Sequence, residues 1–289
     1  MPASALFAAS APAQAAATLL GPADLEAYAR EMPIATTVLP RLQSLMRAEA
    51  TSISDIVDLI MLDPGLAVRV VQAAGNARFG HSRPATSLAE ALLRLGAEEV
   101  YRVTAAFALS RFLNRPVRCY GLGPAEFWRR AIACALTMVD LAPASGLDTR
   151  TAYTVGLLHA TGMVFIDRHL RCVGAPNLRL ASATSEELAR VEIAHTGLHH
   201  AQAAAFVLRA WGFGEEIVEP VEHQLRPGGS LRHREMTSLL AEARAIAGEI
   251  IAQLPRSGEE PVRPLREVLP DEWRAALAER ILAFDGPED

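Results

Sequence analysis

Histidine side chains are the first candidates for chemistry in this sequence, because imidazole ligates divalent metals and transfers protons near neutral pH. Five of them are the candidates for a metal site: His159, His195, His199, His200 and His223. His199 and His200 are adjacent, so on a helix their side chains diverge by about 100° and cannot address one point. Gly197 interrupts any helix that would bring His195 and His199 onto one face. Without a His-Glu-x-x-His motif, these histidines are expected mainly to cap helices or to form hydrogen bonds in the core.

Motifs of other enzyme classes are missing from the sequence. It contains no P-loop, no Gly-x-Ser-x-Gly nucleophile motif and no dinucleotide-binding glycine fingerprint that follows a strand. The three cysteines, Cys119, Cys134 and Cys172, form no Cys-x-x-Cys spacing and no zinc-finger cluster. Their odd number and spacing favour a reducing compartment.

Composition narrows the class of protein further. The chain has 289 residues, 51% of them hydrophobic, which is enough to bury a core without disulfides. All 28 basic residues are arginine, yet the net charge is −5, so a nucleic-acid partner is not expected. Its apolar runs are shorter than the roughly 18 residues of a membrane span. The alanine-rich residues 1–23 lack the basic start of a secretory signal and are predicted to be a flexible tail of a cytoplasmic protein.

Helix signals recur along the chain, whereas strand signals do not. Asp63-Pro64 and Asp148 read as N-caps, and Ser87-x-x-Glu90 has the spacing of a capping box. Pro124 opens a helix, and Gly96 ends the helix that begins after Ser87, before a longer helix over about 98–113. These signals predict an all-α bundle of about ten to twelve helices. The expected organisation is a tail over 1–23, a helical domain over 24–230, and C-terminal helices over 231–289 that pack on the domain or extend it.

Several stretches together resemble the HDOD domain, a helical relative of the HD and HD-GYP phosphohydrolases of bacterial signalling. They are Leu39-Pro40, the segment from Asp63-Pro64 to Phe79-Gly80, residues 84–96, Phe127-Trp128, the Gly-Leu-Leu-His segment ending at His159, and residues 211–223. The resemblance spans about residues 35–230. Most of these residues encode helix ends and core faces, while Asn76 and Arg78 are candidates for contacts with a partner.

The resemblance implies a metal site that this sequence has lost. HD-type enzymes hold a divalent metal with a histidine, an adjacent His-Asp pair on the next helix, and an aspartate on a later helix. The matching positions here are Arg130, His159 with Ala160, and, more loosely, Glu242. A guanidinium has no lone pair for a metal, and a methyl group offers no oxygen ligand. The resemblance is therefore to the non-catalytic branch of the superfamily, and we expect no metal, cofactor or catalytic residue.

The altered site leaves two possibilities open for Arg130. If it faces His159 and Glu242, a buried ion pair would close the former active site; if Glu242 points away, the guanidinium could receive a phosphate. The candidate ligand-binding residues are Arg130, His159, His200, His223 and Glu242.

Three functions are compatible with the sequence. The first is a non-enzymatic regulatory module of bacterial signal transduction that contacts other signalling proteins. The alternative is a receptor for a nucleotide, such as a cyclic dinucleotide, in the former active site. A residual metal-dependent phosphohydrolase comes last, because an unusual ligand set would have to replace the missing groups.

Overall fold

The computed structural model describes residues 19–30, 35–48, 51–75, 85–174, 185–253 and 271–282. In these residues the secondary structure consists of α-helices and short 3₁₀ helices, with one isolated bridge between Val117 and Leu122. This confirms the predicted all-α class. Among the described residues, no helix is long and apolar enough to cross a membrane.

The helices follow one another closely along the chain. The first half contains α1 (Pro22–Arg30), α2 (Ala35–Arg47), α3 (Ile53–Met61), α4 (Pro64–Ala74), α5 (Leu88–Leu113) and α6 (Pro124–Leu141). The second half contains α7 (Thr149–Leu158), α8 (Thr161–Cys172), α9 (Ser185–Thr196), α10 (His200–Ala210), α11 (Glu215–His223), α12 (Arg234–Gln253) and α13 (Asp271–Leu282). Short 3₁₀ helices occupy Arg118–Tyr120, Ala142–Ser145 and Pro227–Gly229. Because α1 begins at Pro22, the last residues of the predicted 1–23 tail are helical.

The predicted caps explain where several helices begin. The Asp63 carboxylate accepts hydrogen bonds from the backbone N–H groups of Gly65 and Leu66, and Pro64 is the first residue of α4. Asp148 and Ser87 cap α7 and α5 in the same way. At Gly96 the backbone adopts φ 72° and ψ 164°, which kinks α5 where the sequence predicts an interruption. Only glycine takes up such a conformation without strain.

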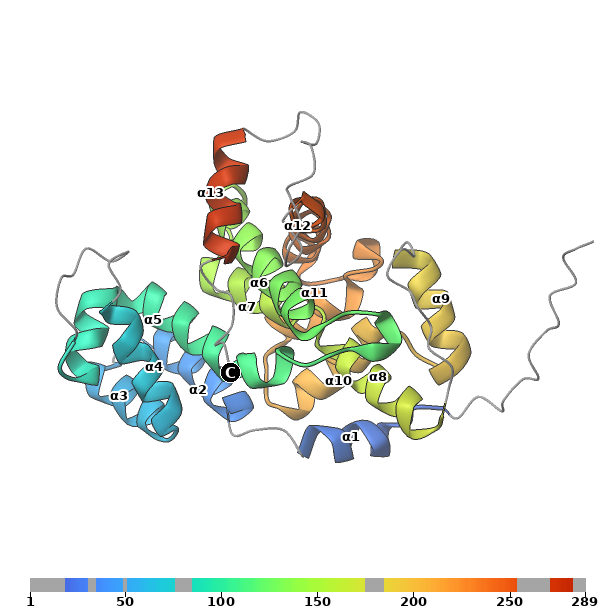
Figure 1. The fold of residues 1–289 in the computed structure, drawn as a ribbon, viewed down its shortest axis with the longest axis horizontal. Coiled ribbons are helices and arrows are strands. Elements are labelled where there is room, and N and C mark those ends of the chain that lie inside the picture. The colour runs from blue at the N-terminus through green and yellow to red at the C-terminus, as the bar shows by residue number, and fades with distance from the viewer. Residues whose placement is uncertain are drawn as a thin grey trace, which may run out of the picture.

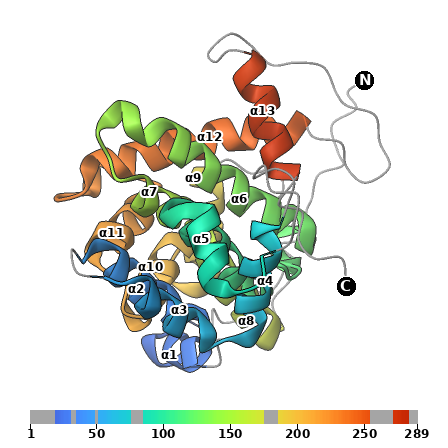
Figure 2. The same ribbon diagram turned by 90° about the vertical axis from the view of Figure 1, so that its left-hand side faces the viewer.

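The helices form two groups around a central layer, as Figure 1 shows. Helices α2 to α5 gather on one side, α8 to α10 on the other, and α6, α7 and α11 lie between them. Figure 2, turned by 90°, brings α4 and α5 to the front of the molecule. The α6 helix is buried from Ala131 to Val139, and Phe127, Trp128, Ile132 and Met138 lie in the core. It therefore forms the centre on which α7 and α12 pack.

The C-terminal helices α12 and α13 pack against α6. The start of α12 is tied to α11 by Glu219, whose Oε1 accepts hydrogen bonds from the Ser230 hydroxyl and from the backbone N–H groups of Leu231 and Arg232. Burial alone would raise the pKa of Glu219, but these donors lower it to about 2. The α13 helix is held by Arg280, which forms two hydrogen bonds with the Asp140 carboxylate on α6.

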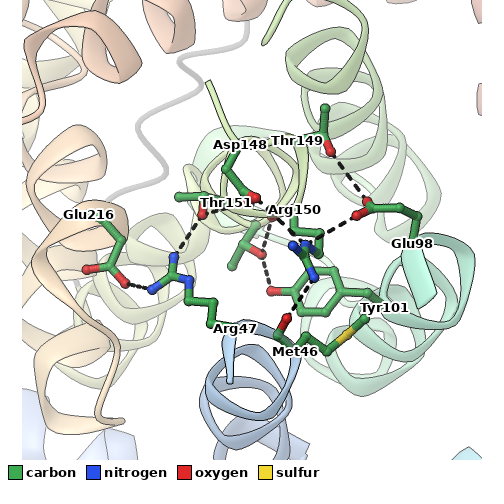
Figure 3. Close-up of polar contacts among 10 residues, drawn as sticks. Met46, Arg47, Glu98, Tyr101, Asp148, Thr149, Arg150, Thr151 and Glu216 are labelled. Atoms are coloured by element: carbon green, nitrogen blue, oxygen red, sulfur yellow. Dashed lines mark hydrogen bonds and ion pairs between the residues drawn. The ribbon is translucent and has the colours of Figure 1, made fainter. Parts of the chain in front are cut away.

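A polar junction joins α2 and α5 to α7 and α11 (Figure 3). Arg47, the last residue of α2, donates to Glu216 Oε1 at 2.5 Å and to Thr151 Oγ1 at 2.9 Å. Arg150 on α7 donates to the carbonyl oxygen of Met46 at 3.0 Å and forms an ion pair with Glu98 at 3.2 Å. Each of these arginines meets a carboxylate and a neutral oxygen, so the junction is both polar and satisfied.

Candidate functional site

A cavity of about 290 Å³ lies among α6, α10, α12 and the turn between α7 and α8. Its polar lining includes Arg130 from α6, His159 from the end of α7, His200 from α10 and Arg244 from α12. Phe127 and Met163 contribute apolar wall. Three of the residues predicted from the sequence, Arg130, His159 and His200, are thus brought to one place.

His159 is buried and neutral at the end of α7. Its Nδ1 lies 2.6 Å from the carbonyl oxygen of Gly156. Since a carbonyl only accepts hydrogen bonds, Nδ1 carries the proton, and Nε2 keeps its lone pair. Burial lowers the pKa of His159 to about 3, with further lowering by the positive charges of Arg244 and Arg130. The imidazole is therefore a hydrogen-bond acceptor in the site at physiological pH.

Ala160 follows His159 at the junction of α7 and α8, where the HD-type enzymes have an aspartate. Its side chain is buried and lines the cavity. A methyl group at this position provides neither a ligand for a cation nor a charge to balance the neighbouring arginines. The position at which the resemblance implies an aspartate in HD-type enzymes thus lies in the wall of this cavity.

His200 belongs to a buried network that the sequence analysis did not identify. Its Nδ1 lies 2.9 Å from Glu192 Oε2, and its backbone N–H donates to the same oxygen at 2.8 Å. The Tyr120 hydroxyl donates to Glu192 Oε1 at 2.6 Å. Burial alone would raise the pKa of Glu192, but the contacts with His200 and Tyr120 lower it overall. The carboxylate is committed to these donors and leaves the cavity without a lining carboxylate.

Arg130 lines the cavity, and the carboxylate that it contacts is not that of Glu242. Its carboxylate contact is Glu126, one turn earlier on α6, at 3.2 Å from Nη2. Its Nε atom is buried and has no hydrogen-bond partner among the described residues. Glu242 is exposed and does not line the cavity. The ion pair considered between Arg130 and Glu242 is therefore replaced by a contact within α6.

Arg244 is a second cavity residue that the sequence analysis missed. It lies on α12, two residues after Glu242, and its Nη1 donates to the carbonyl oxygen of Gln224 at 3.3 Å. Burial lowers the pKa of Arg244 below the usual arginine value. A signal did exist in the sequence, because Arg244 interrupts the helical stripe formed by Leu240, Ala247 and Ile251.

Gln224 links the two sides of this site. Its side-chain Nε2 donates to the main-chain carbonyl oxygen of His159 at 2.8 Å. The main-chain carbonyl oxygen of Gln224 accepts a hydrogen bond from Arg244. His159 and Arg244 are thus positioned by one buried residue at the end of α11. Gln224 therefore connects the main chain at the end of α7 to the Arg244 side chain on α12.

The remaining predicted residues lie elsewhere. His223 is in the last turn of α11, where its ring is close to Gly229, and it does not line the cavity. Asn76 and Arg78 lie outside the described residues. His195 and His199 also stay outside the cavity lining, and His199 caps α10 through its side chain.

Two glycines allow the helices around the cavity to approach closely. A Cβ atom at Gly162 on α8 would overlap the backbone carbonyl of His200, and one at Gly156 on α7 would lie 2.6 Å from Ala135 Cα on α6. Both contacts involve main-chain atoms, which cannot rotate away. The positions of His159 and His200 therefore depend on bare backbone at these two points.

The cavity residues do not fit a divalent metal. Across the described ranges, no group of three or more His, Cys, Asp or Glu residues is arranged to hold a metal ion. The Nε2 lone pair of His159 could ligate a metal, but Arg130 and Arg244 place positive charge beside it. Guanidinium groups repel a cation and attract oxyanions. The site is therefore suited to anions.

Comparison with known proteins places the chain in a family. The HDOD domain model matches residues 32–227, so the chain belongs to the HDOD domain family. No curated protein matches the sequence.

Solved structures share the same fold at low sequence identity. A candidate phosphohydrolase from Shewanella amazonensis is 20% identical, with a TM-score of 0.62 over 91% of this chain and 94% of its own. A candidate signal transduction protein from Marinobacter aquaeolei is 22% identical, with a TM-score of 0.63 over 90% of this chain and 59% of its own. An HDOD domain protein with unknown function from Geobacter sulfurreducens is 19% identical, with a TM-score of 0.60 over 90% and 89%. These likenesses define the fold.

Proposed function

We propose that this protein is a non-catalytic regulatory module of bacterial signal transduction, acting in the cytoplasm through contacts with other signalling proteins. The observation that carries the proposal is the charge of the cavity, where Arg130 and Arg244 flank His159 and Ala160. Metal-assisted hydrolysis needs a cation to activate water and bind phosphate oxygens. This cavity instead presents two guanidinium groups, which supply positive charge but cannot bind and activate water as a metal does.

The metal affinity expected for such a cavity supports the same proposal. Loss of a single outer partner of a metal ligand typically weakens binding by about 10- to 100-fold. This cavity has lost oxygen and imidazole ligands themselves and has gained two positive charges. A resident metal at useful affinity is not expected under these conditions.

Exposed apolar side chains support a role in protein contacts. At the corner between α3 and α4, Met61, Leu62 and Val68 are each more than half exposed, at 56%, 57% and 56%. Large exposed apolar side chains that gather in one region mark surfaces for protein contact. We expect the replacement of Met61 and Leu62 by aspartate to abolish capture of partners from the native cell without changing the fold.

The catalytic part of the proposal is tested by assay and by elemental analysis. Purified protein supplied with manganese, iron or magnesium should hydrolyse neither phosphomonoesters nor cyclic dinucleotides above the rate in buffer. The double variant R130H/A160D serves as the comparison, since it returns an imidazole and a carboxylate to the cavity and should bind Mn²⁺ more tightly than the natural protein. Stoichiometric metal together with turnover in the natural protein would contradict the proposal.

A nucleotide receptor is the second candidate, and the two cavity arginines favour it. The volume of about 290 Å³ is at the small end of the range of ligand sites, which runs from about 300 to 1,000 Å³. This size disfavours a whole cyclic dinucleotide, which carries two bases, two sugars and two phosphates. It leaves room for a smaller phosphorylated compound.

A further inference from the structure

We propose that the cavity is a binding site for a small phosphate monoester, whose phosphate group is held between Arg130 and Arg244. This inference rests on the proposed function, because the cavity must bind phosphate without hydrolysing the ligand. Four properties of the site support such a ligand: its charge, its unused hydrogen-bonding groups, its volume and its preorganisation.

The positive charge of the cavity favours an anionic ligand. Arg130 and Arg244 enter from two different helices, α6 and α12, and both act on the His159 ring. The nearby acidic residues are committed to other partners, Glu126 to Arg130 from outside the cavity and Glu192 to His200 and Tyr120 behind its wall. An oxyanion in the cavity would therefore meet two guanidinium groups and no lining carboxylate.

Unused donors are the second step. Arg130 Nε is buried without a hydrogen-bond partner among the described residues, although a buried N–H without a partner is costly. Arg244 has one hydrogen bond, through Nη1, to a neutral carbonyl, and no carboxylate at ion-pair distance within the described part of the chain. Phosphate oxygens satisfy arginine donors in pairs, because the planar fork of the guanidinium matches two oxygens at once.

His159 supplies the complementary acceptor. With its proton on Nδ1, bonded to Gly156, the Nε2 lone pair accepts a hydrogen bond from a hydroxyl group. A phosphate monoester can provide such a hydroxyl on phosphorus in its monoanion or on the attached sugar or alcohol. The set of two cations and one neutral acceptor therefore recognises an anion that also carries a hydroxyl group.

The volume and walls of the cavity define the organic part of the ligand. About 290 Å³ accommodates a phosphate with a compact substituent. Leu122, Phe127 and Met163 form apolar wall beside the polar groups. Gln224 bonds the main chain of His159 and the guanidinium of Arg244, so two walls of the cavity are joined before a ligand enters, which lowers the ordering cost of binding.

Isothermal titration calorimetry of the full chain tests this site. The probes are inorganic phosphate, ribose 5-phosphate, adenosine 5′-monophosphate and a cyclic dinucleotide, each titrated at the same ionic strength. We expect the two monoesters to bind more tightly than inorganic phosphate, and the cyclic dinucleotide to bind at least tenfold more weakly than the monoesters.

Variants then assign the binding to the two arginines. R130M and R244M should each weaken monoester binding by about tenfold or more, since each removes a charged pair of hydrogen bonds. R244K keeps the charge without the fork and should lie between R244M and the natural protein. Arg30, which is exposed and pairs with Glu26 on α1, provides the matched control, and R30M should bind as the natural protein does.

Each result separates this inference from the proposed function. Absence of monoester binding by the natural protein, or equal binding by R130M, R244M and R30M when circular dichroism shows all three folded, would overturn the phosphate site. Neither result would restore a catalytic role. Conversely, hydrolysis of a bound monoester would overturn the non-catalytic function while leaving the binding site in place.

Discussion

The cavity and the α2–α7 junction contain the same residue type in opposite electrostatic settings. At the junction, Arg47 and Arg150 are each paired with a carboxylate, from Glu216 and Glu98. In the cavity, the hydrogen bond that Arg244 forms with the described residues goes to the neutral carbonyl of Gln224. Arg130 pairs with Glu126 through Nη2 but keeps a buried Nε without a partner in the described part of the chain. The difference indicates that arginines of one chain can join helices through carboxylates in one place and, in our proposal, keep donors for a ligand in another.

Measurements of the free energy of unfolding test this comparison. The largest decrease is expected for a substitution behind the cavity wall. Replacing Glu192 by alanine leaves the Tyr120 hydroxyl and both the ring and the backbone N–H of His200 without an acceptor in the core. We expect the free energy of unfolding to fall by about 3–5 kcal/mol. Urea unfolding followed by far-UV circular dichroism measures the change.

Glu186 on the same helix is exposed and serves as the control for that variant. Its replacement by alanine should change the free energy of unfolding by less than about 0.5 kcal/mol. Equal effects of the two substitutions would mean that the Glu192 network contributes little to the fold.

An intermediate effect is expected at the junction. The substitution Arg150→Met removes the partly buried hydrogen bond to the Met46 carbonyl and the ion pair with the exposed Glu98. The free energy of unfolding should fall by about 1–2 kcal/mol, because the partners lose a charged donor while one of them stays partly hydrated. Thermal and urea unfolding of this variant alongside the natural protein provide the measurement.

The smallest effect on stability is expected for Arg244→Met. The change removes a partly buried charge that has no carboxylate partner among the described residues and keeps most of the apolar length of the side chain. The free energy of unfolding should stay within about 0.5 kcal/mol of the natural value or rise slightly. Destabilisation as large as that of Arg150→Met would show that the cavity arginine is structural, and the comparison between the two regions would fail.

Much of the fold could be predicted because local signals decide where helices begin and end. Asp63-Pro64, Pro124 and Asp148 mark helix starts through capping and fixed backbone angles, and the structure places helix starts there. The interruption at Gly96 was also visible in the sequence. The start of α1 at Pro22 was missed because the preceding alanine-rich residues obscured the boundary of the tail.

The candidate site was predicted only in part. The sequence does not show directly which face of a helix meets the cavity, or which residues distant in the chain pack together. His159 and Arg130 follow recognisable family segments, so their positions could be inferred. Arg244 lies two residues from Glu242, and on a helix that separation turns a side chain to a different face. Glu192 looked like one more polar residue of a surface helix, because its partners Tyr120 and His200 are distant in sequence or on another helix.

The bare backbone contacts at Gly156 and Gly162 set apart what can vary in this pocket from what cannot. A side chain that lines the cavity can be replaced without disturbing how these helices cross, because the crossing contacts are made by main-chain atoms. Even a single methyl group at either crossing point would push two main chains apart. The hollow can therefore acquire new chemistry by one substitution at a time, but its outline depends on two positions that accept no side chain at all.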